Sequence, residues 1–131
     1  DNYHRYGYID SGEKGENVFI DGRLHTVRPI ALRRYPVFVQ NSREYTIMHT
    51  DNFGTVAQIE VGALMIGRIL NHHGAGRIKR GEEKGMFLYG GSTVVVLLEK
   101  GAAQVDELYF NRTTSGEETP VRYGQRIGKK V

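Results

Sequence analysis

Residues 86–98 read Met-Phe-Leu-Tyr-Gly-Gly-Ser-Thr-Val-Val-Val-Leu-Leu, two apolar stretches separated by a pair of glycines. Each stretch has the length and the aromatic or β-branched content of a strand. Adjacent glycines weaken a strand because they lose much conformational entropy and bring no side chain to pack. The break at Gly90-Gly91 therefore indicates a tight bend or bulge, or a backbone held in strained geometry so that Ser92 can react.

Strand-like segments surround this stretch. Residues 44–49 and 55–61 flank the turn-forming run Asp51-Asn52-Phe53-Gly54 and predict a hairpin. Imperfect alternation in the second segment predicts one wetter face, which carries Gln58 and Glu60.

Three further segments complete the expected elements. Residues 36–40 and 103–110 are predicted as strands, and residues 30–34 as a short helical turn. The chain shows neither an internal repeat nor a domain linker. We therefore expect one domain over residues 1–131, a mostly β, strand-rich barrel or sandwich with at most short helical turns.

Composition excludes several classes of protein. With 39% hydrophobic and 25% charged residues the 131-residue chain is globular, and its 17 glycines favour strands joined by tight turns. The absence of cysteine excludes disulfides, thiolate metal sites and a cysteine nucleophile. The net charge of +3 favours an anionic partner, but the basic residues look scattered and match no nucleic-acid motif.

No apolar run approaches the roughly 20 residues that a membrane-spanning helix needs. The chain begins at Asp1 rather than Met. We expect it to be a soluble fragment or processed product with its upstream region missing, and any targeting or anchoring element would lie in that region.

Residues 81–98 resemble the signature of the phosphatidylserine decarboxylase family, in which a Gly-Ser-Thr motif after a glycine-rich, Phe-containing strand is the self-processing site. Residues 59–69 resemble the family's Val-Gly-Ala strand. Tyr3-His4-Arg5 resembles its aromatic-His-Arg motif, and residues 24–29 resemble the strand that follows. These blocks cover nearly the whole chain, in the Gly-Gly-Ser-Thr version of a bacterial branch.

The resemblance implies self-cleavage between Gly91 and Ser92. The Ser92 hydroxyl attacks the Gly91 carbonyl to form an ester, elimination leaves dehydroalanine, and hydrolysis converts position 92 into a pyruvoyl group with loss of ammonia. The products are a β chain of residues 1–91 and an α chain of residues 92–131, in which Thr93 is the first ordinary residue. Gly90 supports the bend before the cut.

The implied reaction is that of a carboxy-lyase. The amine of phosphatidylserine forms a Schiff base with the pyruvoyl group, which takes up the electrons left by departing carbon dioxide, and phosphatidylethanolamine results. Neither a metal nor another cofactor is implied.

Three further side chains are candidates for the site. In the family the motif's His, here His4, is associated with the substrate phosphate and with decarboxylation, and an imidazole suits proton donation near neutral pH. Arg5 would hold a nearby anion, and Phe87 would line the pocket beside His4. Without the resemblance, His4 and Arg5 are surface side chains near a frayed terminus.

The sequence departs from the family at one position. Many members carry a second His three residues after the first, as the base of an Asp-His-Ser triad, and here that position is Gly7. The triad Asp belongs to the family's upstream half. Substitute bases are His25, His49 and the pair His72-His73, of which His25 is preferred because it belongs to the strand that follows His4.

The resemblance also implies partners and location: a phospholipid substrate, a homodimer, and peripheral attachment to the cytoplasmic face of the bacterial cell membrane through the upstream segment. No nucleic acid and no metal are expected. A metal site at His72-His73 is disfavoured because neighbouring side chains of an extended segment point to opposite faces.

Two other hypotheses remain open. In the first, the chain belongs to a pyruvoyl-dependent decarboxylase of a free amino acid, which is the substrate of some relatives. A non-catalytic barrel-sandwich carrier would have Lys84 as its modified residue at a hairpin tip. A Ser-His-Asp hydrolase is disfavoured because Ser92 lacks the Gly-x-Ser-x-Gly elbow.

Overall fold

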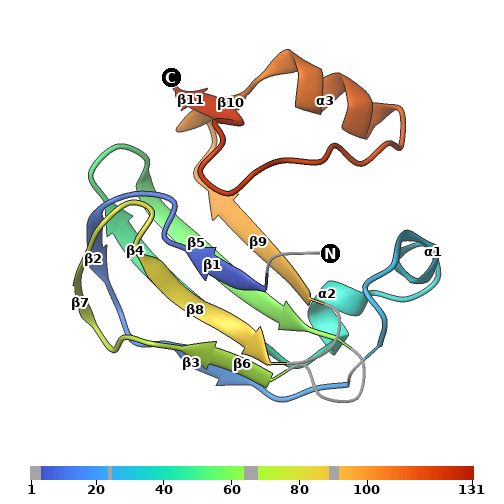
Figure 1. Cartoon of the computed structure of the whole chain (residues 1–131), viewed down its shortest axis with the longest axis horizontal. Helices are drawn as coiled ribbons and strands as arrows, with labels where there is room; N and C mark the ends of the chain where they lie inside the picture. The colour runs from blue at the N-terminus through green and yellow to red at the C-terminus, as the bar shows by residue number, and fades with distance from the viewer. Residues whose placement is uncertain (1–3, 24, 64–67, 89–91) are drawn as a thin grey trace.

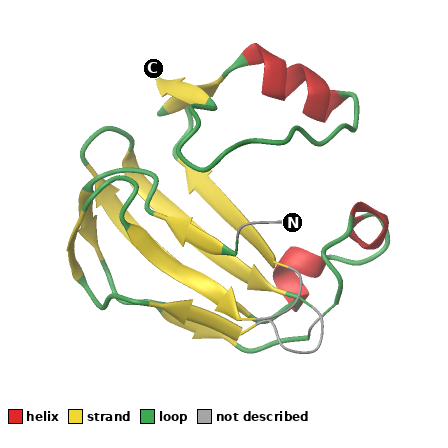
Figure 2. Ribbon diagram, viewed as in Figure 1, coloured by secondary structure: helices red, strands yellow, loops and turns green. Residues whose placement is uncertain are grey.

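The computed structural model describes residues 4–23, 25–63, 68–88 and 92–131. Strands dominate these residues and the helices are short, so the predicted mostly β class is confirmed (Figure 2). The main sheet has the order β7-β2-β4-β5-β9, with β3 paired to β4. Its strands are β2 (Gly12–Lys14), β3 (Val18–Ile20), β4 (Arg43–Thr50), β5 (Gly54–Gly62), β7 (Gly76–Ile78) and β9 (Ser92–Leu98).

A second sheet has the order β1-β8-β6 and lies against one face of the main sheet (Figure 1). Its strands are β1 (Arg5–Gly7), β6 (Arg68–Asn71) and β8 (Glu83–Leu88). The space between the sheets holds an apolar cluster in which Tyr8, Met48, Val56 and Ile78 are buried.

The chain closes with a unit that extends beyond the end of β9 (Figure 1). It consists of β10 (Ala103–Val105), α3 (Glu107–Thr114) and β11 (Gly128–Lys130), with β10 and β11 paired antiparallel. The predicted strand over residues 103–110 is therefore wrong after its first three residues. Glu107 in the first turn and Arg112 in the last complement the helix dipole, and the strand assignment overlooked this helical signal.

The hairpin prediction is confirmed, because β4 and β5 pair in register from Arg43↔Val61 to Thr50↔Gly54. The helical turn near residues 30–34 is confirmed as α1 (Pro29–Leu32). The strand predicted over residues 36–40 is wrong. This segment is α2 (Val37–Gln40), in which the Val37 side chain is buried. The Asn41 amide donates a hydrogen bond to the Val37 carbonyl.

The prediction that Gln58 and Glu60 lie on the solvent-exposed face of β5 is also wrong. Gln58 and Glu60 are 1% and 0% exposed, because the polar side of this strand faces the second sheet. The side toward solvent carries the apolar residues Ala57 and Ile59. Sequence alternation identified the two faces but assigned them the wrong way round.

Candidate active site

Ser92 is the first residue of β9 and lies opposite Gly62, at the last rung of the β5–β9 ladder. Thr93 lies opposite Val61 at the next rung. Ser92 is half-buried, and the residue across from it has no side chain. The predicted cleavage residue Gly91 and its neighbour Gly90 lie outside the described residues.

Asn41 connects this rung to the segment that precedes α1. Its side-chain nitrogen donates to the carbonyl oxygens of Gly62, at 2.8 Å, and His25, at 2.7 Å. Its side-chain oxygen accepts from the His25 amide at 3.0 Å. Since Asn41 is 0% exposed, these bonds form away from water and hold the His25 backbone beside the strand partner of Ser92.

The His25 ring stacks on Tyr35, with centroids 5.4 Å apart and planes 9° from parallel. Its Nε2 is buried and has no hydrogen-bond partner within the described ranges. A buried imidazole nitrogen without a partner has a lone pair or a proton to offer to a neighbouring group. Of the substitute bases named above, His25 is thus the one whose backbone adjoins the Gly62–Ser92 rung.

His4 lies beside β8, the strand that precedes the Gly90-Gly91 pair in the sequence. Its carbonyl oxygen accepts from the Phe87 amide at 2.9 Å, which extends the β1–β8 pairing by one bond. The His4 side chain is exposed. Phe87 is 6% exposed and packs on Tyr6 with centroids 5.0 Å apart, so it is a core residue in this structure.

Arg5 already has an anionic partner. One guanidinium nitrogen lies 3.0 and 3.1 Å from the two carboxylate oxygens of Glu83, which also bonds His72. The bond from Arg5 is the main cause that lowers the pKa of Glu83. A substrate anion would therefore compete with Glu83 for Arg5.

Gly7, at the position of the family's second His, lies against Tyr123. A Cβ at position 7 would stand 2.0 Å from the Tyr123 hydroxyl oxygen, which donates to the Gly81 carbonyl at 2.9 Å. The space for a side chain at position 7 is therefore filled by Tyr123, and position 7 supplies no base.

A buried polar cluster lies between the two sheets. Lys84 Nζ donates to Glu60 at 2.8 Å and to Asn71 at 2.9 Å, while Tyr6 also bonds Asn71. The Asn71 amide nitrogen donates to Glu60 and to Glu44. Glu60 and Lys84 are both 0% exposed. Neither residue was predicted to be buried, because Glu60 lies in a strand of alternating polarity and Lys84 lies in a charged run.

Burial dominates the electrostatics of this pair. It raises the pKa of Glu60, against the opposing effect of Lys84, and it lowers the pKa of Lys84. One carboxylate oxygen of Glu60 is buried without a hydrogen-bond partner among the residues described. Glu60 lies two residues before Gly62, so its side chain shares the strand face of Gly62 and is the diagonal neighbour of Ser92, about 7–8 Å away by ordinary sheet geometry.

The position of Lys84 contradicts the carrier hypothesis. A carrier lysine must be exposed so that another enzyme can modify it and a prosthetic group can swing from it. Lys84 instead lies within β8 with its amine paired inside the protein.

The adjacent histidines have separate partners. His72 bonds Glu83, and His73 bonds the Tyr8 hydroxyl at 3.2 Å. In the ranges that the structure describes, no group of three His, Cys, Asp or Glu side chains gathers in a metal-binding arrangement.

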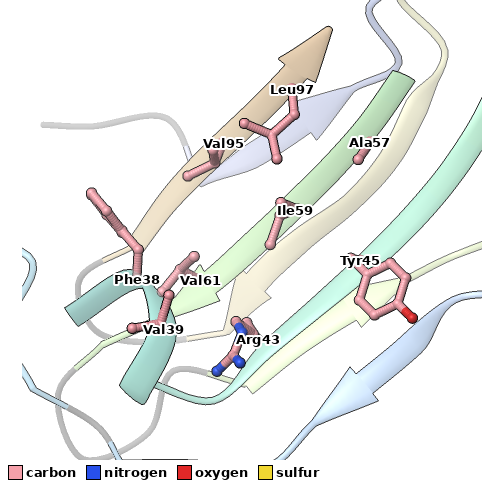
Figure 3. Close-up of a pocket in the computed structure, with 9 residues that line it drawn as sticks. All are labelled: Phe38, Val39, Arg43, Tyr45, Ala57, Ile59, Val61, Val95 and Leu97. Carbon is pink, nitrogen blue, oxygen red and sulfur yellow. The ribbon is translucent and has the colours of Figure 1, made fainter. Parts of the chain in front are cut away.

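An apolar groove runs along the solvent side of the main sheet, starting beside the Ser92 rung (Figure 3). Val61 lines it opposite Thr93, and α2 closes this end with Phe38 and Val39. Arg43 is its charged lining residue. The remaining lining residues are Tyr45, Ala57, Ile59, Val95 and Leu97.

Comparison with known proteins identifies related sequences. The family model described as phosphatidylserine decarboxylase matches residues 1–129. The chain is 46% identical over 129 residues to phosphatidylserine decarboxylase proenzyme 2 of Clostridium acetobutylicum. It is 43% identical over 131 residues to the phosphatidylserine decarboxylase proenzyme of Ruminiclostridium cellulolyticum, and 41% identical over 130 residues to that of Clostridium perfringens.

Each of these matches covers 98% of the chain, which spans 44% of the length of these relatives. No solved structure matches the chain. None of the helices in the described ranges has the length and apolar character that crossing a bilayer requires.

Proposed function

Because the chain belongs to the phosphatidylserine decarboxylase family, we propose that it forms the processing site and part of the active site of an enzyme that converts phosphatidylserine to phosphatidylethanolamine. The observation that carries this proposal is the family match over residues 1–129, with Ser92 of the Gly-Gly-Ser-Thr motif at the open end of a β ladder. The relatives are named for phosphatidylserine, which favours the phospholipid over a free amino acid as the substrate.

Ser92 is the proposed source of a pyruvoyl group, which when present supplies a carbonyl that takes up the electron pair released with carbon dioxide. The surroundings of Ser92 fit such a group. The residue is half-buried, it begins its strand, and Gly62 leaves the opposite position without a side chain. A cut before Ser92 would thus leave the new end of residues 92–131 paired within the sheet.

We assign the proton acceptor for processing to His25. The Ser92 hydroxyl must lose its proton as it attacks the Gly91 carbonyl carbon, and a base is needed for that step. Support comes from the Asn41 bonds, which hold His25 beside Gly62, and from the unpartnered buried Nε2. Tyr123 fills the position where many family members have their histidine.

His4 is the proposed proton donor in decarboxylation and contact to the substrate phosphate. Its backbone is held on Phe87, while its exposed ring can exchange protons with solvent. Arg5 has a supporting role, because its bond to Glu83 fixes β1 to β8 and thereby sets the position of His4.

The cellular location and the oligomeric state are also proposed from the family resemblance. From the family resemblance we propose that the enzyme attaches peripherally to the cytoplasmic face of the bacterial cell membrane. A homodimer is proposed from the family resemblance.

Intact-mass spectrometry of the purified full-length protein tests the processing step. The expected result is two polypeptides cut before residue 92, the smaller of which reacts with carbonyl reagents and has no free amino terminus. Ser92→Ala is expected to give one uncut chain without decarboxylase activity, whereas the control Ser115→Ala, at an exposed position on the C-terminal unit, is processed normally. His25→Gln should slow processing by about 100-fold or more, the usual contribution of a positioned base.

Assays with phosphatidylserine and with free serine separate the two substrate hypotheses. Release of carbon dioxide from the phospholipid alone supports the proposal. An uncut wild-type protein that never reacts with carbonyl reagents would show that the proposed chemistry is wrong.

A further inference from the structure

The segment between Asp21 and Glu44 contains five arginines and no acidic residue. The arginines are Arg23, Arg28, Arg33, Arg34 and Arg43. Their spacing of one to nine residues made them look scattered in the sequence. Arg28, Arg33 and Arg34 are exposed and form no ion pair with any described residue, so their positive charge is not neutralised within the described part of the molecule.

The same segment exposes apolar side chains. Its two short helices are anchored by Ala31 and Val37, which are 7% and 1% exposed. Ile30 and Val39 point the other way and are 69% and 67% exposed. Leu32, Tyr35 and Phe38 are also exposed. Single apolar residues are normal on a protein surface, whereas a cluster of them is typical of an interaction site, and five of residues 30–39 are exposed and apolar.

These exposed side chains form what we call the α1–α2 surface, and it adjoins the candidate active site. Phe38 and Val39 belong both to this surface and to the apolar groove, whose floor includes Val61 and Val95 (Figure 3). Val61 is one rung from the Gly62–Ser92 pair. The cartoon shows α2 beside the start of β9, with α1 further out (Figure 1).

We propose that the α1–α2 surface docks on a bilayer that contains anionic phospholipid and turns the Ser92 end of the β5–β9 ladder toward it. Exposed Ile and Val side chains insert at the headgroup boundary, while arginines beside them attract the negative surface. The apolar groove then continues from the membrane contact toward Ser92. The docking proposal rests on the proposed function, because a phospholipid substrate lies in the bilayer surface on which the protein would dock.

Charge and polarity favour the bilayer over other partners. In a symmetric pair of copies the same patch meets itself, so the unneutralised arginines would face one another. Nucleic-acid interfaces are strongly polar, and the exposed apolar side chains would gain nothing there. An anionic bilayer offers both a negative surface and an apolar interior.

Vesicle binding of the purified full-length protein tests this docking. The vesicles contain phosphatidylcholine with phosphatidylglycerol, an anionic lipid that the proposed reaction does not consume, and the bound fraction is measured by co-sedimentation. The double variant Arg33→Gln/Arg34→Gln is expected to bind about 25-fold more weakly, at about fivefold for each basic residue lost near the surface. Ile30→Ser/Leu32→Ser, which changes two exposed residues of α1 that do not line the groove, is expected to weaken binding by at least about tenfold.

Matched controls exist on the C-terminal unit. Lys129 and Lys130 are exposed basic residues, and Leu108 and Phe110 are exposed by 60% and 65%. Lys129→Gln/Lys130→Gln and Leu108→Ser/Phe110→Ser remove the same kinds of side chain from another place. Both controls should bind within about twofold of wild type, which is less than the effect of losing one basic residue near the membrane surface.

Activity separates docking from chemistry. On a monomeric short-chain phosphatidylserine, the docking variants should turn over substrate like wild type, while on phosphatidylserine vesicles they should lose activity in proportion to binding. Unchanged vesicle binding in both docking variants, equal losses in the controls, or a change in self-association instead of vesicle binding would overturn the docking proposal. Altered vesicle binding in a protein that decarboxylates no form of the lipid would leave docking in place and refute the proposed function.

Discussion

Asn41 joins three backbone groups of two distant segments, and no water reaches it. Asn41→Ala would leave the carbonyls of Gly62 and His25 and the amide of His25 without this partner. Buried groups that lose their partner cost about 1–3 kcal/mol each, so we expect a loss of about 3 kcal/mol in unfolding free energy. Processing should slow as well, because Gly62 aligns Ser92. Urea denaturation and the time course of residues 92–131 in mass spectra measure the two effects.

The control for this variant is Asn111→Ala on α3, where the side chain is exposed. That change should leave both stability and processing near wild type. An Asn41→Ala protein that is as stable and as rapidly processed as wild type would contradict the positioning role of Asn41.

The buried pair of Glu60 and Lys84 predicts a pH dependence. Lys84→Met leaves the Glu60 carboxylate buried without its cation, which costs about 3–5 kcal/mol. Burial raises the pKa of Glu60 above its ordinary value of 4.5, and removing Lys84 removes the main effect that opposes this. Stability is therefore retained at pH values below 4.5 and declines as the pH rises through the raised pKa of the folded state.

Denaturation at pH 5 and at pH 8 measures this effect. The gap between Lys84→Met and wild type should widen at the higher pH, and Glu60→Gln/Lys84→Met should lose the pH dependence. Lys79→Met, at an exposed position, is the matched control and should show neither effect. A gap that narrows toward pH 8 would refute the assignment.

At the scale of elements, Gly7 in β1 and Tyr123 near the C-terminus form a coupled contact. Gly7→Ala pushes a methyl group into the Tyr123 hydroxyl, which has to give up its bond to Gly81. We expect a loss of about 1–3 kcal/mol, as for other overpacked sites. In a Tyr123→Ala background the same change should lose less than half as much, because the obstructing ring is gone. A double-mutant cycle by thermal or urea denaturation measures the coupling, and strict additivity would show that the contact is absent in solution.

Strands were predictable from sequence where local preference and tertiary contacts agree. Residues 44–61 combine β-branched residues with a turn sequence, and their hairpin is confirmed. Residues 36–40 are equally rich in β-branched and aromatic residues, yet they form α2. Long-range contacts decide there, since Val37 is folded into the core and Asn41 is bonded to Gly62 and His25. Single-residue preference contains no information on such contacts.

The candidate site was predictable only through its motif. Ser92, His4 and His25 were named from the resemblance and from chain order, whereas Asn41 and the Glu60–Lys84 pair were missed. In the sequence Asn41 directly follows a strand-like segment, where asparagine is commonly a turn residue. Glu60 alternates with apolar residues as a solvent-facing charge would, and Lys84 follows two glutamates in a charged run. Only the three-dimensional pairing shows that each neutralises the other inside the fold.

At the scale of the whole molecule, a cut before Ser92 should not separate the two products. β9 keeps seven residue pairs with β5, from Gly62↔Ser92 to Val56↔Leu98, and β5 belongs to the other product. We expect residues 1–91 and 92–131 to elute together in native size-exclusion chromatography and to separate in strong denaturant. Uncleaved Ser92→Ala protein gives the reference elution volume, and dissociation of the wild-type products in native buffer would contradict the observed pairing.

β9 is also the outermost strand on its side of the main sheet in the described structure. Its outer backbone groups are therefore open to strands of other molecules, and residues 93–98 read Thr-Val-Val-Val-Leu-Leu, without a charge or a proline to discourage such pairing. We therefore expect that any association in concentrated preparations starts from this strand.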